Sequence, residues 1–295
     1  KLLELLDQRE PGALNDLLTR GVFSYADVPY RLEPYARILA NPHETIVYDE
    51  PHAARIAARV EAMGSDGRLV QDRKGQVQHA NLFEKLLVPA LSKLSNLVPD
   101  GGIWMNTQRP EWNDANNALV GYGVSMVTLG YLRRYLVFLD RQLIAASHAG
   151  TGLPVAREVA EWLRAVHTVL RDRRDVLGAT SASDTARREI MDALGLAFEA
   201  YRGRVHGRGF CGEQALLGFD EVRALCRDAV AHLDHAIACN RRADGLAHSY
   251  NLLVPARSGR AMGLQIINLM LREKADIKFL RPAEAATHSG ETTTH

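Results

Sequence analysis

Hydrophobic residues recur at helical spacing along most of the chain. The segment 80–97 places leucines on one face of a helix despite Pro89, and 125–147 is a long apolar-rich pattern with Ser125 well placed as its N-cap. A leucine pattern near the beginning is interrupted by a Pro-Gly pair. The sequence therefore predicts helices over residues 1–20, 52–64, 80–97, 125–147, 154–177, 181–202, 218–242 and 259–274.

The connections between these helices carry the turn-forming residues. Two X-Gly pairs within 65–78 predict a small hairpin or loop, and residues 103–105 predict a short extended piece. No alternation of strands and helices is visible, and no G-x-G-x-x-G motif follows a strand. We therefore expect an all-α fold in which long paired helices form a helical toroid or a bundle.

The composition is that of an ordinary globular protein. Of the 295 residues, 46% are hydrophobic and 24% are charged, and the formal net charge is +1. This balance gives no electrostatic case for a nucleic acid or an anionic membrane as the main partner. The first residues, KLLELLDQRE, read as the middle of a helix, so we expect a chain that is trimmed or belongs to a longer protein. We expect one domain over 1–285 and a disordered tail over 286–295.

Three cysteines without C-x-x-C spacing argue against a disulfide framework or a zinc ribbon. We therefore expect a reducing compartment, the cytoplasm. No apolar run approaches the ~20 residues of a membrane span. His232, His235 and Cys239 share one face of a predicted helix, with His248 just beyond, and such residues can bind zinc. Without a closed four-ligand set or an H-E-x-x-H motif, an ordinary helix face is the simpler interpretation, and we predict no metal and no cofactor.

The segment 108–123, QRPEWNDANNALVGYG, differs from the helical patterns around it. Glu111 and Asp114 are candidates for acid–base chemistry, and Trp112 offers a flat apolar face of the kind on which sugar rings stack. An indole would also desolvate a neighbouring carboxyl group and raise its pKa. A plain Asx-rich turn remains the alternative. The remaining polar side chains that we expect to bind substrate are Arg109, Asn113, Asn116 and Asn117.

The run WNDAN at 112–116, followed by LVGYGVS at 119–125, resembles the (G)DWNDGMN…VG…G-x-G-E-S signature of the cellobiose and chitobiose phosphorylases. Those enzymes are inverting glycoside phosphorylases with an (α/α)6 toroid. The resemblance implies such a toroid, or part of one, built from antiparallel helical hairpins. It also implies that Asp114 is the general acid, and Glu111 stands where the family usually has an Asp. Ala115 and Val124 depart from the signature, which has Gly and Glu there.

Inverting cleavage needs a second group on the other face of the sugar, either a base that activates water or a bound phosphate. Glu213 and Asp244 are candidates for the base. A Gly-rich stretch over 201–213 carries Arg204, His206 and Arg208, which we predict to bind phosphate if a phosphate site exists. A surface turn with solvated arginines is the simpler interpretation of that stretch.

Residues 244–251 are expected to form a turn that leads to a short strand. His248 and Tyr250 on it are predicted to line the substrate site, with a plain connecting turn as the alternative.

Two functions follow from these features. The first is a carbohydrate-active enzyme that cleaves a glycosidic bond by inverting hydrolysis or phosphorolysis, with an oligosaccharide as substrate and inorganic phosphate as a second partner in the case of phosphorolysis. The second is a catalytically inactive helical toroid that acts as a glycan-binding or protein-interaction scaffold.

Overall fold

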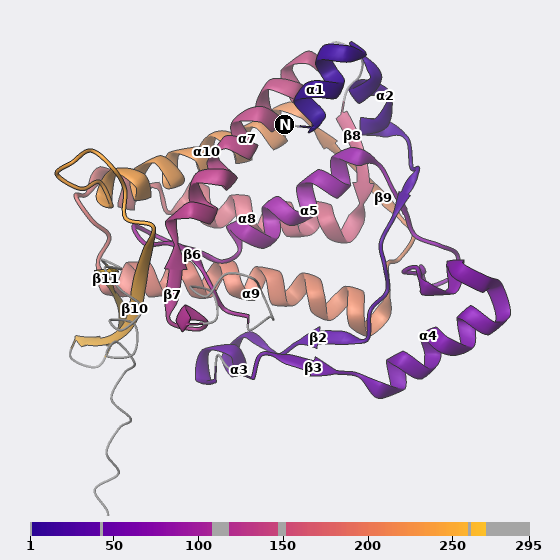
Figure 1. Cartoon of the computed structure of the whole chain (residues 1–295), viewed down its shortest axis with the longest axis horizontal. Coiled ribbons are helices and arrows are strands. Elements are labelled where there is room, and N and C mark those ends of the chain that lie inside the picture. Colours follow the sequence, from indigo (N-terminus) through magenta and orange to yellow (C-terminus); the bar gives the residue numbers. More distant parts are fainter. Residues whose placement is uncertain (1, 42–43, 108–117, 147–151, 259–260, 270–295) are drawn as a thin grey trace, which may run out of the picture.

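The computed structural model describes residues 2–41, 44–107, 118–146, 152–258 and 261–269. The chain is mostly helical, as the sequence predicts (Figure 1). It begins with two short helices, α1 (Leu2–Arg9) and α2 (Ala13–Thr19). Gly12 separates them with φ 92°, a left-handed conformation that glycine adopts without a steric penalty. The predicted interruption at the Pro-Gly pair is thus confirmed.

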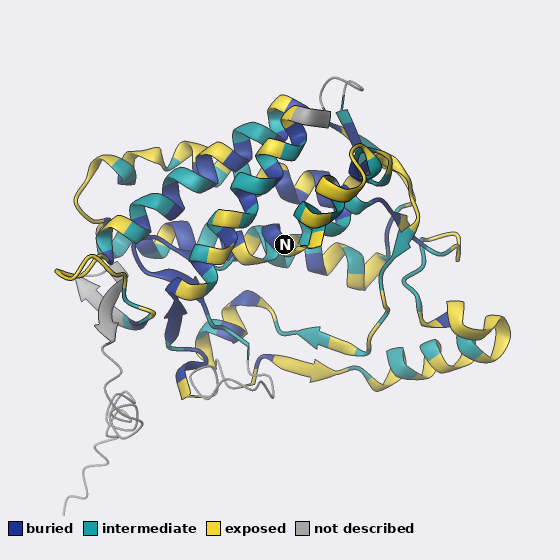
Figure 2. Ribbon diagram, turned by 45° about the horizontal axis from the view of Figure 1, so that its top comes forward, coloured by how far each residue is buried: buried dark blue, intermediate teal, exposed yellow. Residues whose placement is uncertain are grey.

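Five longer helices form the core. They are α5 (Leu82–Leu94), α7 (Met126–Ala146), α8 (Arg157–Asp172), α9 (Asp184–Arg208) and α10 (Phe219–Cys239). Their inward faces bury leucines almost completely, and each such side chain contributes about 1.5–3 kcal/mol. In Figure 2 the buried residues are concentrated along these long helices.

Side-chain caps fix where three of these helices begin. Asn81 accepts a hydrogen bond from the Glu84 amide at 2.8 Å, and Ser125 accepts one from the Thr128 amide at 3.1 Å. Ser183 caps α9 in the same way. Such caps typically contribute about 1 kcal/mol each. The N-cap role predicted for Ser125 is confirmed.

A five-stranded antiparallel sheet covers one end of the helices, so the expected all-α fold holds only in part: the chain is mostly helical but not entirely so. Its strands are ordered β11-β10-β7-β6-β5. Two of them, β10 and β11, form the largest hairpin and lie beside the first half of α9 in Figure 1. The bounds are β5 (Leu97–Val98), β6 (Gly102–Trp104), β7 (Gly123–Ser125), β10 (Tyr250–Ser258) and β11 (Ala261–Leu269).

The helix predicted over 259–274 is therefore wrong, because β11 occupies most of that range. Ser258 pairs with Ala261, which leaves a two-residue connection, the commonest length in β-hairpins. The apolar run is short and contains Gly263 and two adjacent isoleucines, Ile266 and Ile267. A run of this length does not distinguish a strand from a helix by its periodicity, and β-branched residues favour the strand.

The remaining elements lie outside this group of five helices and the five-stranded sheet. Three strand pairs join distant segments: β1 (Phe23–Ser24) with β4 (His79–Ala80), β2 (Tyr30–Leu32) with β3 (Ile46–Tyr48), and β8 (Gly152–Ala156) with β9 (Gln214–Gly218). The other helices are α3 (Tyr35–Ala40), α4 (Glu50–Met63) and two 3₁₀ helices, Gly64–Arg68 and Arg174–Gly178. α4 lies at the periphery and buries none of its residues (Figure 2).

The fold class is thus mostly helical with small antiparallel sheets, and the toroid stays a prediction. The expected tail, 286–295, lies outside the described residues. Among the described helices, none combines the length and the apolar character needed to cross a bilayer.

Candidate functional site

The described residues on either side of 108–117 meet at one place in the sheet. Strand β6 pairs with β7, so Trp104 lies opposite Val124. One step further, the Met105 amide donates to the Gly123 carbonyl at 2.9 Å, and the Gly121 amide donates to the Met105 carbonyl at 2.6 Å. These bonds form a closed stem at the base of the segment that contains residues 108–117.

The two glycines of the LVGYG run are needed for this stem. Gly121 has φ 84°, where a side chain would be strained. A Cβ added to Gly123 would lie 2.5 Å from the Leu119 Cβ and 2.8 Å from the Leu119 carbonyl oxygen, so no larger residue fits without a shift. The part of the run that resembles the phosphorylase signature therefore has a structural role, which is to return the chain to the sheet.

A cleft of about 440 Å³ opens beside the N-terminal side of this stem. Its lining comes from α5, β2, β6, α7 and α9. The chain enters the segment 108–117 from this lining, because Asn106 and Thr107 both belong to it. The lining residues are Leu32, Pro89, Ser92, Lys93, Asn96, Ile103, Trp104, Met105, Asn106, Thr107, Thr128 and Phe198.

The polar side chains of this cleft form a chain of hydrogen bonds that runs from Thr107 to the Ser92 carbonyl. The Thr107 hydroxyl donates to the Asn106 side-chain oxygen at 3.0 Å, and the Asn106 amide donates to the Asn96 side-chain oxygen at 2.7 Å. The Asn96 amide in turn donates to the Ser92 carbonyl at 2.9 Å. An amide group has two N–H donors and two acceptor lone pairs, so each Asn keeps capacity for a ligand hydroxyl.

Trp104 belongs to the lining of the cleft, but its ring is almost entirely buried and leaves no face free for a ligand to stack on. Its side chain is only 5% exposed, and its indole N–H donates to the Gly121 carbonyl at 2.9 Å. The ring meets Tyr35 edge-on. Trp104 is therefore a core residue, and its indole ties β6 to the stem.

Seven predicted site residues lie outside the described residues. They include both carboxylates and the indole on which the acid–base hypothesis depends. These residues are Arg109, Glu111, Trp112, Asn113, Asp114, Asn116 and Asn117.

The structure brings Tyr250 to the stem and leaves His248 at the turn. Tyr250 opens β10 opposite Ser125 and packs against the small apolar cluster of Leu119 and Leu252. The His248 amide donates to the Asn240 carbonyl at 3.1 Å, and its side chain is half-buried. The expected turn followed by a strand is confirmed. Tyr250 packs against the cluster that contains Leu119, a residue of the segment 108–123.

The Gly-rich stretch is helical up to residue 208 and is not a surface turn there, while phosphate binding by it stays a prediction. α9 continues to Arg208, and Arg204 and His206 lie in its last two turns. Residues two apart on a helix point about 200° away from each other, so His206 faces away from the two arginines. The three side chains do not converge, and Arg204 pairs with Glu161.

Helix α9 continues through this stretch despite its glycines, because the residues between them pack against the core. Gly203 and Gly207 each cost about 1 kcal/mol in a helix interior. Between them, Val205 packs against the core, as Tyr201 does one turn earlier. This burial offsets the cost, and the helix ends only at Gly209, where φ is 69°.

Neither candidate base lines the cleft. Glu213 is 64% exposed and pairs with Arg157 at 2.6 Å, beside the strand pair β8–β9 at the other end of α9 from the five-stranded sheet (Figure 1). Asp244 pairs with Arg242 at 2.7 Å and accepts a hydrogen bond from the Leu246 amide, as in an Asx turn. Among the described residues that line the cleft there is no carboxylate, and Lys93 is the charged one.

Sequence reasoning missed the amides of the cleft because they lie on either side of the β5–β6 hairpin and not on one element. Asn96 and Asn106 are ten residues apart, and only the antiparallel turn between β5 and β6 brings them together. No local pattern in the sequence marks such a pair.

The histidine–cysteine face of α10 divides into two parts. His232 is buried, its Nε2 lies 2.8 Å from the Leu170 carbonyl, and burial lowers its pKa. His235 and Cys239 instead meet Asp100 from the turn between β5 and β6.

Neither a family model nor a curated protein sequence matches the chain.

Proposed function

We propose that the chain is a carbohydrate-active enzyme that cleaves a glycosidic bond with inversion, with Asp114 as the general acid. The observation that carries the proposal is the closed stem at Met105 and Gly121, which opens onto the polar cleft. The residues that resemble the phosphorylase signature lie between the two sides of that stem in the sequence.

The cleft supports a polyhydroxylated ligand. Its amides and hydroxyls, from Asn96, Asn106 and Thr107, alternate donors and acceptors along one wall. Apolar surface from Phe198 and Leu32 completes the lining. Sugars present the same combination of hydroxyl edges and apolar ring faces. Small-molecule sites typically combine an apolar lining with a few such polar groups.

The chemistry requires protonation of the glycosidic oxygen as the bond to the anomeric carbon breaks. Asp114 in its protonated form would supply that proton, while water or phosphate attacks the opposite face. A positioned acid contributes about 10²–10⁴-fold to the rate. In this proposal Trp112 and Asn113 contact the sugar beside the acid.

The described lining of the cleft is more consistent with phosphate as the attacking group than with water activated by a base. A hydrolytic base would be a carboxylate ~6.5–9.5 Å from the acid. The described lining contains Lys93 and no carboxylate, and a cation favours an anionic acceptor. The same lack of a carboxylate favours the second candidate, a scaffold that binds glycans without turnover.

The test is release of reducing sugar or sugar 1-phosphate from a panel of β-glucans and β-glucosides, with and without phosphate. We expect turnover by the unmodified chain and loss of about 10²–10⁴-fold in Asp114→Asn. Asp244→Asn is the matched control, because its carboxylate lies in an exposed turn. Binding by calorimetry without any product would support the scaffold instead, and neither binding nor product would rule out both.

A further inference from the structure

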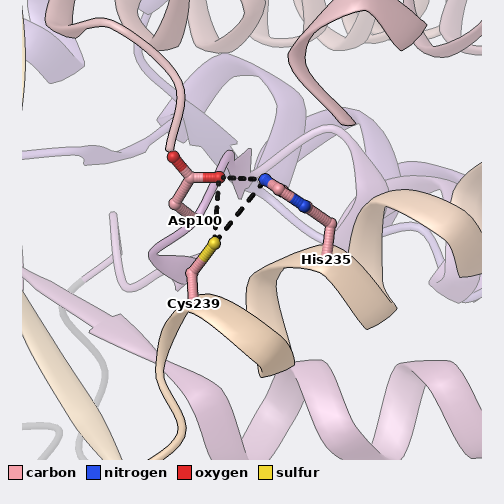
Figure 3. A group of neighbouring side chains, drawn as sticks. All are labelled: Asp100, His235 and Cys239. Carbon is pink, nitrogen blue, oxygen red and sulfur yellow. Dashed lines mark hydrogen bonds and ion pairs between the residues drawn. The ribbon is translucent and has the colours of Figure 1, made fainter. Parts of the chain in front are cut away.

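A second cleft, of about 750 Å³, lies where α10 meets the turn between β5 and β6. Three side chains with metal-binding atoms converge in it: Asp100 from the turn, and His235 and Cys239 from the last turn of α10 (Figure 3). His235 and Cys239 are four residues apart, so a helix places them on one face. None of them takes part in the function proposed above.

The three atoms are close together. Nε2 of His235 lies 3.2 Å from Oδ1 of Asp100 and 3.6 Å from Sγ of Cys239, and Sγ lies 3.9 Å from the same Oδ1. A tetrahedral ion with Zn–S of about 2.3 Å and Zn–N and Zn–O of about 2.0–2.2 Å separates its ligands by about 3.3 Å (N···O) and 3.5–3.6 Å (S···N and S···O). The observed separations are near those edges, and the ion fits between the atoms with small side-chain movements.

Surrounding groups orient the Asp100 carboxylate for this role. Its Oδ2 accepts hydrogen bonds from the Ser181 hydroxyl at 2.9 Å, the Ala182 amide at 2.6 Å and the Arg187 guanidinium at 3.2 Å. Oδ1 is thereby directed to His235 and Cys239. Metal-binding carboxylates are commonly fixed by such neighbouring hydrogen bonds.

The turn itself is held firmly. Asn240 donates from its side chain to the Asp100 carbonyl, and Asn251, which is fully buried, donates to the Gly101 carbonyl at 2.7 Å. Asp100 has φ 63°, a left-handed conformation in which glycine is preferred. Asp is among the non-glycine residues that adopt this conformation most readily, so a carboxylate is compatible with the turn.

The geometry disfavours a nucleophilic cysteine. In a Cys–His–Asp arrangement the imidazole uses one nitrogen for the nucleophile and the other for the carboxylate. Here Cys239 and Asp100 both face Nε2 of His235.

We propose that Asp100, His235 and Cys239 bind one Zn²⁺ ion. Zinc accepts carboxylate oxygen, imidazole nitrogen and thiolate sulfur together, whereas magnesium and calcium prefer oxygen ligands. On binding, the Cys239 Sγ–H bond breaks, the Zn–S bond forms and the proton leaves to solvent. Neutral His235 donates its Nε2 lone pair.

The charges at the site then balance. One carboxylate and one thiolate offset the two positive charges of the ion. Arg187 also contacts Oδ2, but Asp184 pairs with it at 2.9 Å and offsets its charge. The only such three-ligand group among the described residues is this one.

Three protein ligands leave the fourth coordination position open toward the cleft. Zinc sites with three protein ligands and an open position bind water or a substrate atom, whereas structural sites are closed by four ligands. Thr180, whose carbonyl accepts the Cys239 thiol hydrogen bond at 3.4 Å, lines the same cleft. The site would therefore take a small donor molecule such as water.

The test is a titration of the chelator-treated full chain with Zn²⁺, read by calorimetry and by competition with a chromophoric chelator. Co²⁺ is added in parallel, because a Co²⁺–thiolate bond gives a charge-transfer absorption that no other ligand here produces. Cys239→Ser and His235→Gln remove one ligand each. Cys211→Ser is the matched control, since its thiol is also unpaired but lies in the connection between α9 and β9, not on α10.

We expect one Zn²⁺ per chain, binding weakened by about 100-fold or more in the two ligand variants, and a Co²⁺–thiolate band that disappears in Cys239→Ser and persists in Cys211→Ser. Loss of an outer partner alone typically costs 10–100-fold. No binding by the unmodified chain, equal binding by Cys239→Ser, or a thiolate band that depends on Cys211 would overturn the proposal. Circular dichroism of each variant checks that it is folded.

Discussion

Gly121 and Met105 are joined by a hydrogen bond of 2.6 Å from the Gly121 amide to the Met105 carbonyl. These residues lie on either side of residues 108–117 in the sequence, and the bond joins the two flanks of that segment. Because Met105 also lines the polar cleft, the stem and the cleft form one unit. Disturbing the stem should therefore affect both stability and any activity at the cleft.

The first prediction concerns Gly123, which leaves no room for a side chain. We expect Gly123→Ala to destabilise the fold by about 1–3 kcal/mol, as overpacking does, because its Cβ would lie 2.5 Å from the Leu119 Cβ. Gly130 in α7 is the control, since an added Cβ there meets nothing within 4 Å. Gly130→Ala should stabilise the helix by up to about 1 kcal/mol. Urea denaturation measures both, and equal effects of the two substitutions would contradict this account of the stem.

The second prediction compares two adjacent arginines on α9. Arg187 and Asp100 are both 4% exposed, so Arg187→Met leaves a buried carboxylate without its cation and should cost about 3–5 kcal/mol. Arg188 and its partner Asp192 are 26% and 33% exposed, and Arg188→Met should cost no more than about 1 kcal/mol. Thermal or chemical denaturation of both variants checks the ranking. A cost for Arg188→Met that matches that of Arg187→Met would refute it.

The third prediction concerns Glu84, a carboxyl group that is 2% exposed on α5. It accepts hydrogen bonds from the Tyr25 hydroxyl at 2.9 Å and the Ala156 amide at 2.7 Å, but burial outweighs them and raises its pKa above the ordinary 4.5. The folded state thus binds the proton more tightly than the unfolded state. The contribution of Glu84 to stability is present below about pH 4.5 and is lost as the pH rises through its raised pKa.

Glu84→Gln removes that titration and keeps the hydrogen bonds, since the Tyr25 hydroxyl can accept from the new amide. The difference in unfolding free energy between the unmodified chain and the variant should shift in favour of the variant as the pH rises through this window. Urea denaturation over a pH series measures it. Parallel pH profiles for the two proteins would show that Glu84 does not titrate as described.

The fourth prediction concerns the acceptor. If phosphate binds beside Lys93, Lys93→Met should raise the KM for phosphate and leave the binding of the glycan unchanged. Lys85 is the control, because its ammonium group lies over the Tyr25 ring and donates to the Ser24 carbonyl. Initial rates of Lys93→Met and of the control Lys85→Met, at varied phosphate concentration, distinguish the two variants. An unchanged phosphate KM in Lys93→Met would favour water as the acceptor.

Much of the helical fold was predictable because its apolar periodicity is long. Residues 125–147 carry the period over several turns and have a capping serine, so both the helix and its beginning were clear. Strand β11 was not predictable, because its apolar run is short and its partner β10 is set by tertiary contacts. The extension of α9 through Gly203 and Gly207 likewise depends on buried neighbours that the local sequence does not reveal.

The sites show the same division. His235 and Cys239 could be paired from their helical spacing, but Asp100 reaches them from a turn more than a hundred residues earlier. Asn96 and Asn106 form a pair only because β5 and β6 are antiparallel. Local spacing finds ligands on one helix, whereas ligands from different elements require the fold.

The central claim is that Asp114 gives a proton to the leaving oxygen, and leaving-group dependence measures this most directly. Rates of the unmodified chain and Asp114→Asn are compared on an alkyl or sugar β-glycoside and on a dinitrophenyl β-glycoside, whose leaving group needs no protonation. The account predicts a loss of about 10²–10⁴-fold on the first substrate and little loss on the second. Equal rates of the two proteins on the unactivated substrate, or equal losses on both substrates, would contradict it.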